Sequence, residues 1–351
     1  MAREMPLGIA LLLLTVLLFK LWAEDLADLF TQSEVKSGLF KMLDPVSTIF
    51  QLERNGNIFE NLMVSHSGAI YGTRFDAPEI WSVDPEKQTG YRLTIIPGVR
   101  AVMGIAELRP NLLVVAAGNF TPGSYQIWKI RLLPNTPAIK QVASIPEANW
   151  LNGLVAWDSD NVLVADSIVG AVFKINISIG NYSVAGSDVD TMTDGTSDGS
   201  VPPGLGINGI RVHDKYMYFT NAAQSIFCRV KINDDAYLFG HVEIIASGFS
   251  QDDFAIDDDG SAYIAAGDQN SVVRVTPTGN VSTLAGSLGA MDLAGSTSCA
   301  FRRDATDRRR HEDRAGKVLY VSTSGGVWEP VNGTAIEPGK IAMVHFVREL
   351  K

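Results

Sequence analysis

The sequence predicts an all-β fold, a six-bladed β-propeller built from four-stranded blades. Three observations support this prediction: one strand–turn–strand pattern occurs six times, its copies begin 43 to 56 residues apart, and no useful helical periodicity follows residue 45. Two alternating strands joined by a turn and followed by further short strands are typical of a propeller blade. A β-sandwich would not explain the recurring period.

The six copies share one order of elements. Each begins with two residues that are often small or polar, continues as an apolar alternating strand, turns, and enters a second strand rich in Val, Tyr, Leu and Ala. In chain order they are ENLMVSHSGAIYGT from Glu60, MGIAELRPNLLVVAAG from Met103, NGLVAWDSDNVLVAD from Asn152, NGIRVHDKYMYFTN from Asn208, DDFAIDDDGSAYIAAG from Asp252, and TSCAF with KVLYVSTSGG from Thr297.

A third strand follows each copy, and an outer strand follows five of the six. The third strands are EIWSVDP, QIWKIRL, AVFKINI, SIFCRVKI, SVVRVTP and GKIAMVHF, and the outer strands are YRLTIIPGV, AIKQVASIP, YSVAGS, HVEIIASGF and NVSTLAGS. The segment VSTIFQLE at 46–53 has the character of the missing outer strand. We therefore expect the ring to close by pairing this N-terminal strand with the C-terminal blade.

The N-terminal segment has the pattern of a secretory signal peptide. Arg3 precedes an apolar run from Leu7 to Phe19, which is followed by Lys20 and the small residue Ala23. The run is shorter than the roughly 20 residues that span a membrane, which favours cleavage near Ala23 over a signal anchor. We expect a signal peptide at 1–23, an N-terminal extension at 24–45 and the propeller at 46–351, in a chain that enters the secretory pathway or is secreted and keeps no membrane span.

The composition indicates the compartment of the chain and the classes of partner that it can bind. Five Asn-X-Ser/Thr triplets agree with a secreted glycoprotein, and they begin at Asn119, Asn176, Asn181, Asn280 and Asn332. Cys228 and Cys299 are too few for a disulfide framework and predict two buried free thiols. A net charge of -10 argues against nucleic acid, because phosphate binding needs a basic surface. We expect a monomer that binds a small molecule.

The first residues of the six copies are the candidate site. In a propeller the first strand of each blade lines the central channel, so these residues converge at one mouth. They are Glu60, Met103, Asn152, Asn208, Asp252 and Thr297, with Asp253 beside them. Converging carboxylates repel each other, and Ca²⁺ would remove this conflict through carboxylate and Asn oxygens. The alternative interpretation is that Asn-Gly and Asp only cap turns.

The chain resembles the senescence-marker-protein/gluconolactonase superfamily of six-bladed propellers over residues 46 to 346. The resemblance implies that a divalent metal, usually calcium, is held by Glu60, Asn152, Asn208 and Asp252. Within the superfamily, ENL, NGI, DDFAID and TSCAF resemble a fungal branch encoded with secondary-metabolite pathways. Some members of that branch are hetero-Diels-Alderases that join tropolone quinone methides to humulene-type terpenes in meroterpenoid assembly.

The two resemblances imply different chemistry. A calcium-dependent lactonase would use Asp252 as general base and the cation as Lewis acid. The sugar lactonases commonly carry an Arg two residues before the third-blade Asn, where this chain has Trp150. A flat apolar ring suits an aromatic or terpenoid ligand better than a sugar acid.

A cycloaddition enzyme needs no cofactor, because it acts by positioning and by hydrogen bonds to a developing oxyanion. Asn152, Asn208 and Asp252 are its candidate catalytic groups, and Met103, Trp150, Asp253, Thr297 and Trp328 are its candidate substrate contacts. We favour this pericyclase hypothesis over the lactonase and over a non-catalytic ligand-binding propeller.

Three irregular segments remain. Residues 187–206 join blades three and four at the channel mouth, as a lid or as a disordered insertion, and their Asp spacing does not fit an EF-hand. Residues 327–338 form a second loop at the mouth and carry Trp328. Residues 302–317, of mixed charge, belong to the opposite face and have the composition of a solvated loop or of an unremoved intron.

Overall fold

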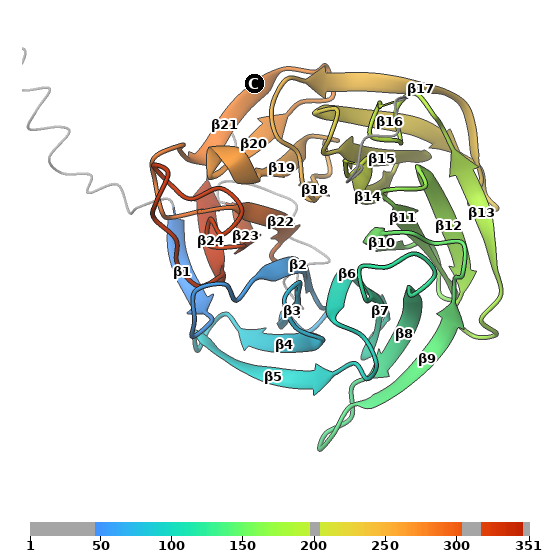
Figure 1. Cartoon of the computed structure of the whole chain (residues 1–351), viewed down its shortest axis with the longest axis horizontal. Coiled ribbons are helices and arrows are strands. Elements are labelled where there is room, and N and C mark those ends of the chain that lie inside the picture. The colour runs from blue at the N-terminus through green and yellow to red at the C-terminus, as the bar shows by residue number, and fades with distance from the viewer. Residues whose placement is uncertain (1–45, 197–203, 304–316, 347–351) are drawn as a thin grey trace, which may run out of the picture. The chain divides into compact units, whose positions relative to one another are not determined.

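The computed structural model describes residues 46–196, 204–303 and 317–346. The predicted signal peptide and N-terminal extension lie outside the described residues, as does most of the charged loop at 302–317. Within the described ranges the chain forms six four-stranded antiparallel sheets arranged as a ring (Figure 1). The six-bladed propeller predicted from the sequence is thereby confirmed.

The first three blades follow one another along the chain. Blade one consists of β2 (Phe59–Val64), β3 (Ile70–Arg74), β4 (Glu79–Asp84) and β5 (Thr89–Ile95). Blade two consists of β6 (Ala101–Arg109), β7 (Leu112–Gly118), β8 (Gln126–Arg131) and β9 (Ala138–Ser144). Blade three consists of β10 (Leu151–Ala156), β11 (Asn161–Asp166), β12 (Ala171–Asn176) and β13 (Tyr182–Ser187).

The last three blades complete the ring. Blade four consists of β14 (Ile207–His213), β15 (Tyr216–Asn221), β16 (Ile226–Ile232) and β17 (Leu238–Ser247). Blade five consists of β18 (Phe254–Ile256), β19 (Ala262–Ala266), β20 (Ser271–Val275) and β21 (Val281–Gly286). Blade six consists of β22 (Ser296–Phe301), β23 (Lys317–Thr323), β24 (Lys340–Phe346) and β1 (Val46–Gln51).

Blade six closes the ring with strands from both ends of the described chain. Strand β1 pairs antiparallel with β24, from Val46 opposite Val344 to Gln51 opposite Lys340. The side chain of Gln51 adds a hydrogen bond from Nε2 to the carbonyl oxygen of Pro338 at 3.0 Å. The predicted closure by an N-terminal outer strand is confirmed.

Glycines let neighbouring inner strands approach each other. A Cβ atom at Gly104 would overlap the backbone of Asn152, one at Gly153 the backbone of Asn208, and one at Gly209 would overlap Asp253. None of these three glycines has a positive φ, so they serve close approach and not a turn. Asn152 and Asn208 precede two of these glycines, and each is the second residue of its inner strand.

Buried hydroxyl groups join neighbouring blades near the channel. Oγ1 of Thr73 donates to the carbonyl oxygen of Met103 at 2.7 Å, and Oγ of Ser167 to that of Ile207 at 2.6 Å. Oγ1 of Thr220 donates to the carbonyl oxygen of Asp252 at 2.7 Å. In each case a hydroxyl in, or directly after, the second strand of a blade satisfies a carbonyl of the next blade's inner segment, which helps to fix the spacing of the blades.

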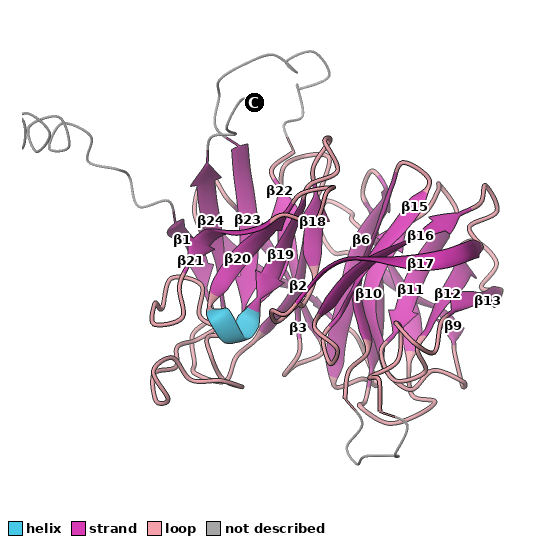
Figure 2. Cartoon of the chain, turned by 90° about the horizontal axis from the view of Figure 1, so that it is seen from above, coloured by secondary structure: helices cyan, strands magenta, loops and turns pink. Residues whose placement is uncertain are grey.

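Apolar side chains fill the spaces within and between the sheets. Cys228 and Cys299 are fully buried and unpaired with each other, as predicted. The one helical turn among the described residues is η1 (Gly267–Gln269), a short 3-10 element at one end of the ring (Figure 2). In the described part of the chain, no helix is long and apolar enough to cross a membrane.

Candidate functional site

The inner strands carry β-bulges at the candidate residues. Pairing with the second strand shifts register around Glu60, Met103, Asn152, Asn208 and Thr297. A bulge inserts an unpaired residue into a strand and re-aims its side chain. Five blades thus use the same local irregularity to turn one side chain away from the regular pleat at the same level of the ring.

The structure brings Glu60, Asn208 and Asp252 together at the centre of the ring. Burial, and after it the charge of the nearby Asp253, raises the pKa of Glu60 to about 8. The pKa of Asp252 also lies well above its usual value, because of burial first and then the Glu60 and Asp253 charges, while a hydrogen bond from Asn208 opposes the shift. At neutral pH Glu60 therefore favours the protonated form, and the pKa of Asp252 is shifted in the same direction.

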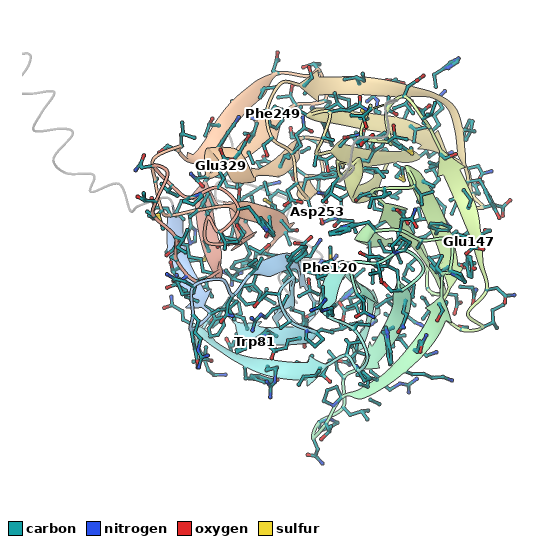
Figure 3. All side chains as sticks on the ribbon, viewed as in Figure 1. Trp81, Phe120, Glu147, Phe249, Asp253 and Glu329 are labelled. Atoms are coloured by element: carbon teal, nitrogen blue, oxygen red, sulfur yellow. The ribbon has the colours of Figure 1, made fainter. Side chains whose placement is uncertain are left out.

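The sequence predicted that Asp253 contacts the substrate, whereas in the structure protein groups surround its side chain. It lies near the centre of the ring (Figure 3), but its carboxylate is already bound by protein donors. Arg211 Nη1 lies 3.0 Å from Oδ1, and Asn61 Nδ2 donates to Oδ2 at 2.7 Å. The backbone nitrogen of Phe254 donates to Oδ1 at 2.7 Å. With a side chain 2% exposed, Asp253 serves the internal network of the channel.

Met103 and Thr297 are also enclosed. Met103 is 1% exposed and belongs to a core cluster with residues of blades two and three. Thr297 is 1% exposed, and its Oγ1 donates to the carbonyl oxygen of Phe59 at 2.8 Å while lying 2.8 Å from Oγ of Ser322. Both side chains therefore support the walls of the channel, and neither offers a free polar group.

The predicted metal ligands fit a hard cation by their chemistry. Glu60 and Asp252 are carboxyl groups whose mutual repulsion a cation would relieve. Asn208 Oδ1 is buried without a hydrogen-bond partner, as a free carbonyl ligand would be, and Asn152 Nδ2 is turned to Ser167 Oγ at 3.3 Å. Among the described residues, no group of three or more His, Cys, Asp or Glu could hold a metal. A cation would thus depend on both amides.

Aromatic rings from four blades gather around Trp150. The ring of Phe120 lies 5.2 Å from Trp150 and 4.8 Å from Phe75, and Trp328 packs edge-on against Phe75 at 5.2 Å between ring centroids. We call Phe75, Phe120, Trp150 and Trp328 the aromatic wall. Trp150 and Trp328 were predicted from the sequence, whereas Phe75 and Phe120 were missed. Their position between the second and third strands of a blade was the signal that could have found them.

Backbone hydrogen bonds to Asp166 hold Trp150 in place. The backbone nitrogens of Asn149 and Trp150 donate to its carboxylate at 2.7 and 3.1 Å, and those of Ile168 and Val169 donate to Oδ1 at 3.1 and 2.9 Å. Asp166 is fully buried at the end of β11. One carboxylate thereby couples the turn after β11 to the segment that presents Trp150.

Two further polar residues near the site were missed by the sequence prediction. Gln251 is 1% exposed, directly precedes Asp252, and has both side-chain amide atoms buried without partners. Tyr125 lies beside Trp150 with ring centroids 6.4 Å apart, and its hydroxyl is buried without a partner. Unsatisfied buried polar groups are uncommon in folded proteins and mark places where a ligand, ion or water is bound.

The loop between blades three and four is anchored where it is described. Asn221 Nδ2 donates to the carbonyl oxygens of Thr191 and Thr193 at 2.8 and 2.6 Å, and Gln224 Nε2 donates to that of Asp190 at 2.9 Å. Met192 is 1% exposed within a core cluster. The first half of the loop is thus fixed to blade four, and residues 197–203 of the predicted lid at 187–206 lie outside the described residues.

Comparison with solved structures defines the class of the fold. The chain is similar to a luciferin-regenerating enzyme with a TM-score of 0.61 and 13% identity, covering 85% of this chain and 94% of that one. It is similar to regucalcin, a calcium-binding protein of Agrobacterium tumefaciens, with a TM-score of 0.57 and 14% identity, covering 85% and 96%. Both similarities extend over most of the ring, and they support the fold of the chain.

Sequence relatives give the more specific resemblance. A Phoma sp protein named as a candidate hetero-Diels-Alderase is 26% identical over 308 residues, covering 76% of this chain and 84% of that protein. A second protein of that name, from Sarocladium schorii, is 24% identical over 315 residues, covering 76% and 75%. No model of a known protein family matches the chain.

Proposed function

We propose that the chain catalyses a hetero-Diels–Alder cycloaddition between a reactive quinone methide and a terpene at the channel mouth. The observation that carries this proposal is the placement of the aromatic wall beside Tyr125. Burial is the main cause that raises the pKa of Tyr125, and the nearby Asp166 and Glu60 also raise it. The rings thus adjoin the carboxyl and amide groups of the inner strands. The names of the Phoma and Sarocladium relatives support the same reaction class.

The residues perform this reaction mainly by positioning. The heterodiene and the alkene form one C–C and one C–O bond, nothing leaves, and no proton is gained or lost overall. Holding two reactants in a near-attack geometry can supply roughly 7 to 11 kcal/mol of the barrier. The amides of Asn152 and Asn208 supply hydrogen-bond donors for the oxygen on which negative charge develops, and the raised pKa of Asp252 favours its carboxyl group as a further donor.

A turnover assay with matched variants tests the proposal. The quinone methide is generated in situ, mixed with humulene, and the adduct is followed with and without protein. We expect faster formation of a single stereoisomer, and a fall of about tenfold or more for Trp150→Arg, which removes a planar wall and adds a buried charge. Trp81→Arg, on the outer part of blade one, is the control for the substitution itself. An unchanged product ratio with the native chain would refute the proposal.

The second candidate is a calcium-dependent lactonase, favoured by the unpartnered Asn208 Oδ1 beside two carboxyl groups. If a cation binds, Glu60, Asn152, Asn208 and Asp252 would hold it, and it would polarise a ligand oxygen as a Lewis acid. Hydrolysis of aromatic, aliphatic and sugar lactones with calcium and then with chelator distinguishes the two functions. Chelator-sensitive turnover that is lost in Asp252→Asn would establish the lactonase, whereas binding without turnover in either assay would indicate a non-catalytic propeller.

A further inference from the structure

We propose that the aromatic wall binds the planar partner of the reaction, and that this partner is a neutral conjugated carbonyl compound. The inference rests on the proposed function and deepens it, because it assigns one reactant to one side of the mouth. The wall comprises Phe75, Phe120, Trp150 and Trp328, which reach the mouth from blades one, two, three and six.

The geometry of the wall suits a flat ligand. The rings of Phe75, Phe120 and Trp150 are tilted by 35 to 39° to each other, with centroids 4.8 to 6.3 Å apart. These values are typical of stabilising aromatic pairs, the kind of contact that a flat π system could extend. Trp328 is 55% exposed, so the outermost ring is open to solvent.

Phe120 is held in a backbone conformation that side chains rarely adopt. Its φ is 59°, in the left-handed region that disfavours residues with a Cβ atom. Hydrogen bonds fix the turn on both sides: Ser124 Oγ accepts from the Asn119 nitrogen at 3.1 Å, and Asn119 Nδ2 donates to the Gly98 carbonyl at 3.1 Å. Strain of this kind persists at ligand sites where the surroundings determine the conformation. The ring is therefore pre-positioned before a ligand arrives.

Two donors beside the wall lack an acceptor. Trp150 Nε1 and the Tyr125 hydroxyl are buried without partners, and an indole N–H can only donate. A Cβ atom at Gly118 would overlap the Tyr125 ring, so the absence of a side chain at Gly118 gives this ring its place. Trp150 belongs to the wall and Tyr125 lies beside it, with ring centroids 6.4 Å apart, so a ligand that supplies the acceptor would lie against the wall. The ligand therefore brings an oxygen that accepts, as a carbonyl does.

The buried Asp166 disfavours an anionic ligand beside the wall. Burial raises the pKa of Tyr125 first, and the charge of Asp166 raises it further. The fully buried Asp166 carboxylate lies directly behind Trp150, 3.1 Å from its backbone nitrogen. A carboxylate ligand would meet this negative field in a poorly solvated place, which disfavours it relative to a neutral carbonyl of the same shape.

Equilibrium dialysis with four probes tests each part of the proposal on the full chain. The probes are 2-acetonaphthone, the isosteric hydrocarbon 2-isopropenylnaphthalene, the anion 2-naphthoate and the saturated analogue decalinyl methyl ketone. We expect the naphthyl ketone to bind about five- to tenfold more tightly than the hydrocarbon, which is the contribution of one hydrogen bond. The affinity for the naphthyl ketone should exceed the affinities for the anion and for the saturated ketone by at least a similar factor.

Matched variants assign the effect to residues. Tyr125→Phe removes only an unpartnered hydroxyl, so the denaturant midpoint should hold while the preference for ketone over hydrocarbon falls to less than half. Phe120→Leu should weaken binding of the two neutral naphthyl probes, the ketone and the hydrocarbon, about tenfold. Phe239→Leu on the outer strand of blade four, where Phe239 is 52% exposed, should change the binding of neither. If Phe120→Tyr binds the planar probes as tightly as the native chain does, whereas Phe120→Leu does not, the aromatic ring itself is required.

The outcomes separate this inference from the proposed function. Equal binding of ketone and hydrocarbon by the native chain, or tighter binding of the anion, would overturn the inference even if the cycloaddition assay succeeds. A retained preference in Tyr125→Phe, or equal effects of Phe120→Leu and Phe239→Leu, would do the same. If the preferences are as expected and no cycloaddition occurs, the subsite stands and the proposed reaction fails.

Discussion

Arg211 and Asp253 form an ion pair that joins the inner strand of blade four to the segment entering blade five. Nη1 of Arg211 lies 3.0 Å from Oδ1 of Asp253, and the Asp253 side chain is only 2% exposed. Asn61 Nδ2, from blade one, donates to the same carboxylate at 2.7 Å. One carboxylate thus links three blades, and its charge depends on a single guanidinium for compensation.

Replacing that guanidinium should destabilise the fold. Arg211→Met leaves the Asp253 carboxylate buried without its cation, and we expect the free energy of unfolding to fall by about 3 kcal/mol. Arg92→Met is the matched control, because Arg92 is 52% exposed in its pair with Glu79 and should cost less than about 0.5 kcal/mol. Urea denaturation at pH 7 measures both. Equal midpoints for the two variants would contradict the role assigned to the pair.

A second prediction follows from the close approach of the inner strands. Gly209→Ala would place a Cβ atom against the Asp253 side chain and the backbone of blade five, and we expect a loss of about 2 kcal/mol from overpacking. Gly289→Ala is the control, since its nearest neighbour, Asn332 Oδ1, would lie at an ordinary 3.4 Å. Thermal unfolding of both variants decides the matter. A Gly209→Ala protein as stable as Gly289→Ala would show that the strands can move apart.

The pH dependence of stability should carry the signature of Glu60. Its folded-state pKa of about 8 lies above the usual 4.5, so the folded chain binds the extra proton between these values. Its contribution to stability is therefore fully present below about pH 4.5 and is lost as the pH rises toward 8. The slope from this group is at most about 1.4 kcal/mol per pH unit. Glu60→Gln should flatten the profile between pH 5 and 8.

Calcium provides the control for that profile. Measured in chelator, the native chain should lose stability as the pH rises, and a bound cation would reverse the loss because it needs the ionised carboxylates. We expect any stabilisation by calcium to be larger at pH 8 than at pH 5 and absent in Glu60→Gln. A native profile in chelator that changes between pH 5 and 8 to the same extent as that of Glu60→Gln would contradict the raised pKa.

Glycosylation, if the chain is secreted as predicted, should be uneven over the five triplets. Asn181, Asn280 and Asn332 are exposed. Asn119 Nδ2 instead donates to the Gly98 carbonyl at 3.1 Å, and Asn176 Nδ2 to Asn161 Oδ1 at 3.2 Å. We expect glycans at the three exposed sites and low occupancy at the other two. Mass spectrometry of the secreted chain after enzymatic deglycosylation reads each site, and full occupancy at Asn119 would contradict the prediction.

The fold could be predicted from the sequence because its signals are local. Alternating strands and their turns occupy neighbouring residues, and the missing sixth outer strand could be supplied by counting alone. The convergence of Asn152 and Asn208 at the channel followed from their equal place in the repeat. The β-bulges that re-aim them could not be predicted, because a bulge is a relation between two paired strands and leaves no pattern in one of them.

The missed residues share a physical reason. Phe75 and Phe120 lie in loops without periodicity, and their contact depends on how two blades pack side by side. Asp253 carried the same apparent signal as Asp252, yet Arg211 turns it into an internal group. Trp150 was found because it departed from a known motif, whereas Tyr125 departs from nothing and becomes notable only when its hydroxyl is seen without a partner.

During synthesis the ring cannot close until the C-terminal blade has been made. Strand β1 is made first among the described strands, but the carbonyl that accepts from Gln51 belongs to Pro338, 287 residues later. At about 5 to 20 residues per second, the ribosome needs roughly 15 to 60 s to deliver that partner. Throughout this interval β1 is an uncovered strand edge, available to other chains. A chain truncated before Lys340 would lack the partner of β1, so this strand edge would remain unpaired. The cell's quality-control machinery would then encounter five complete blades beside an unclosed sixth.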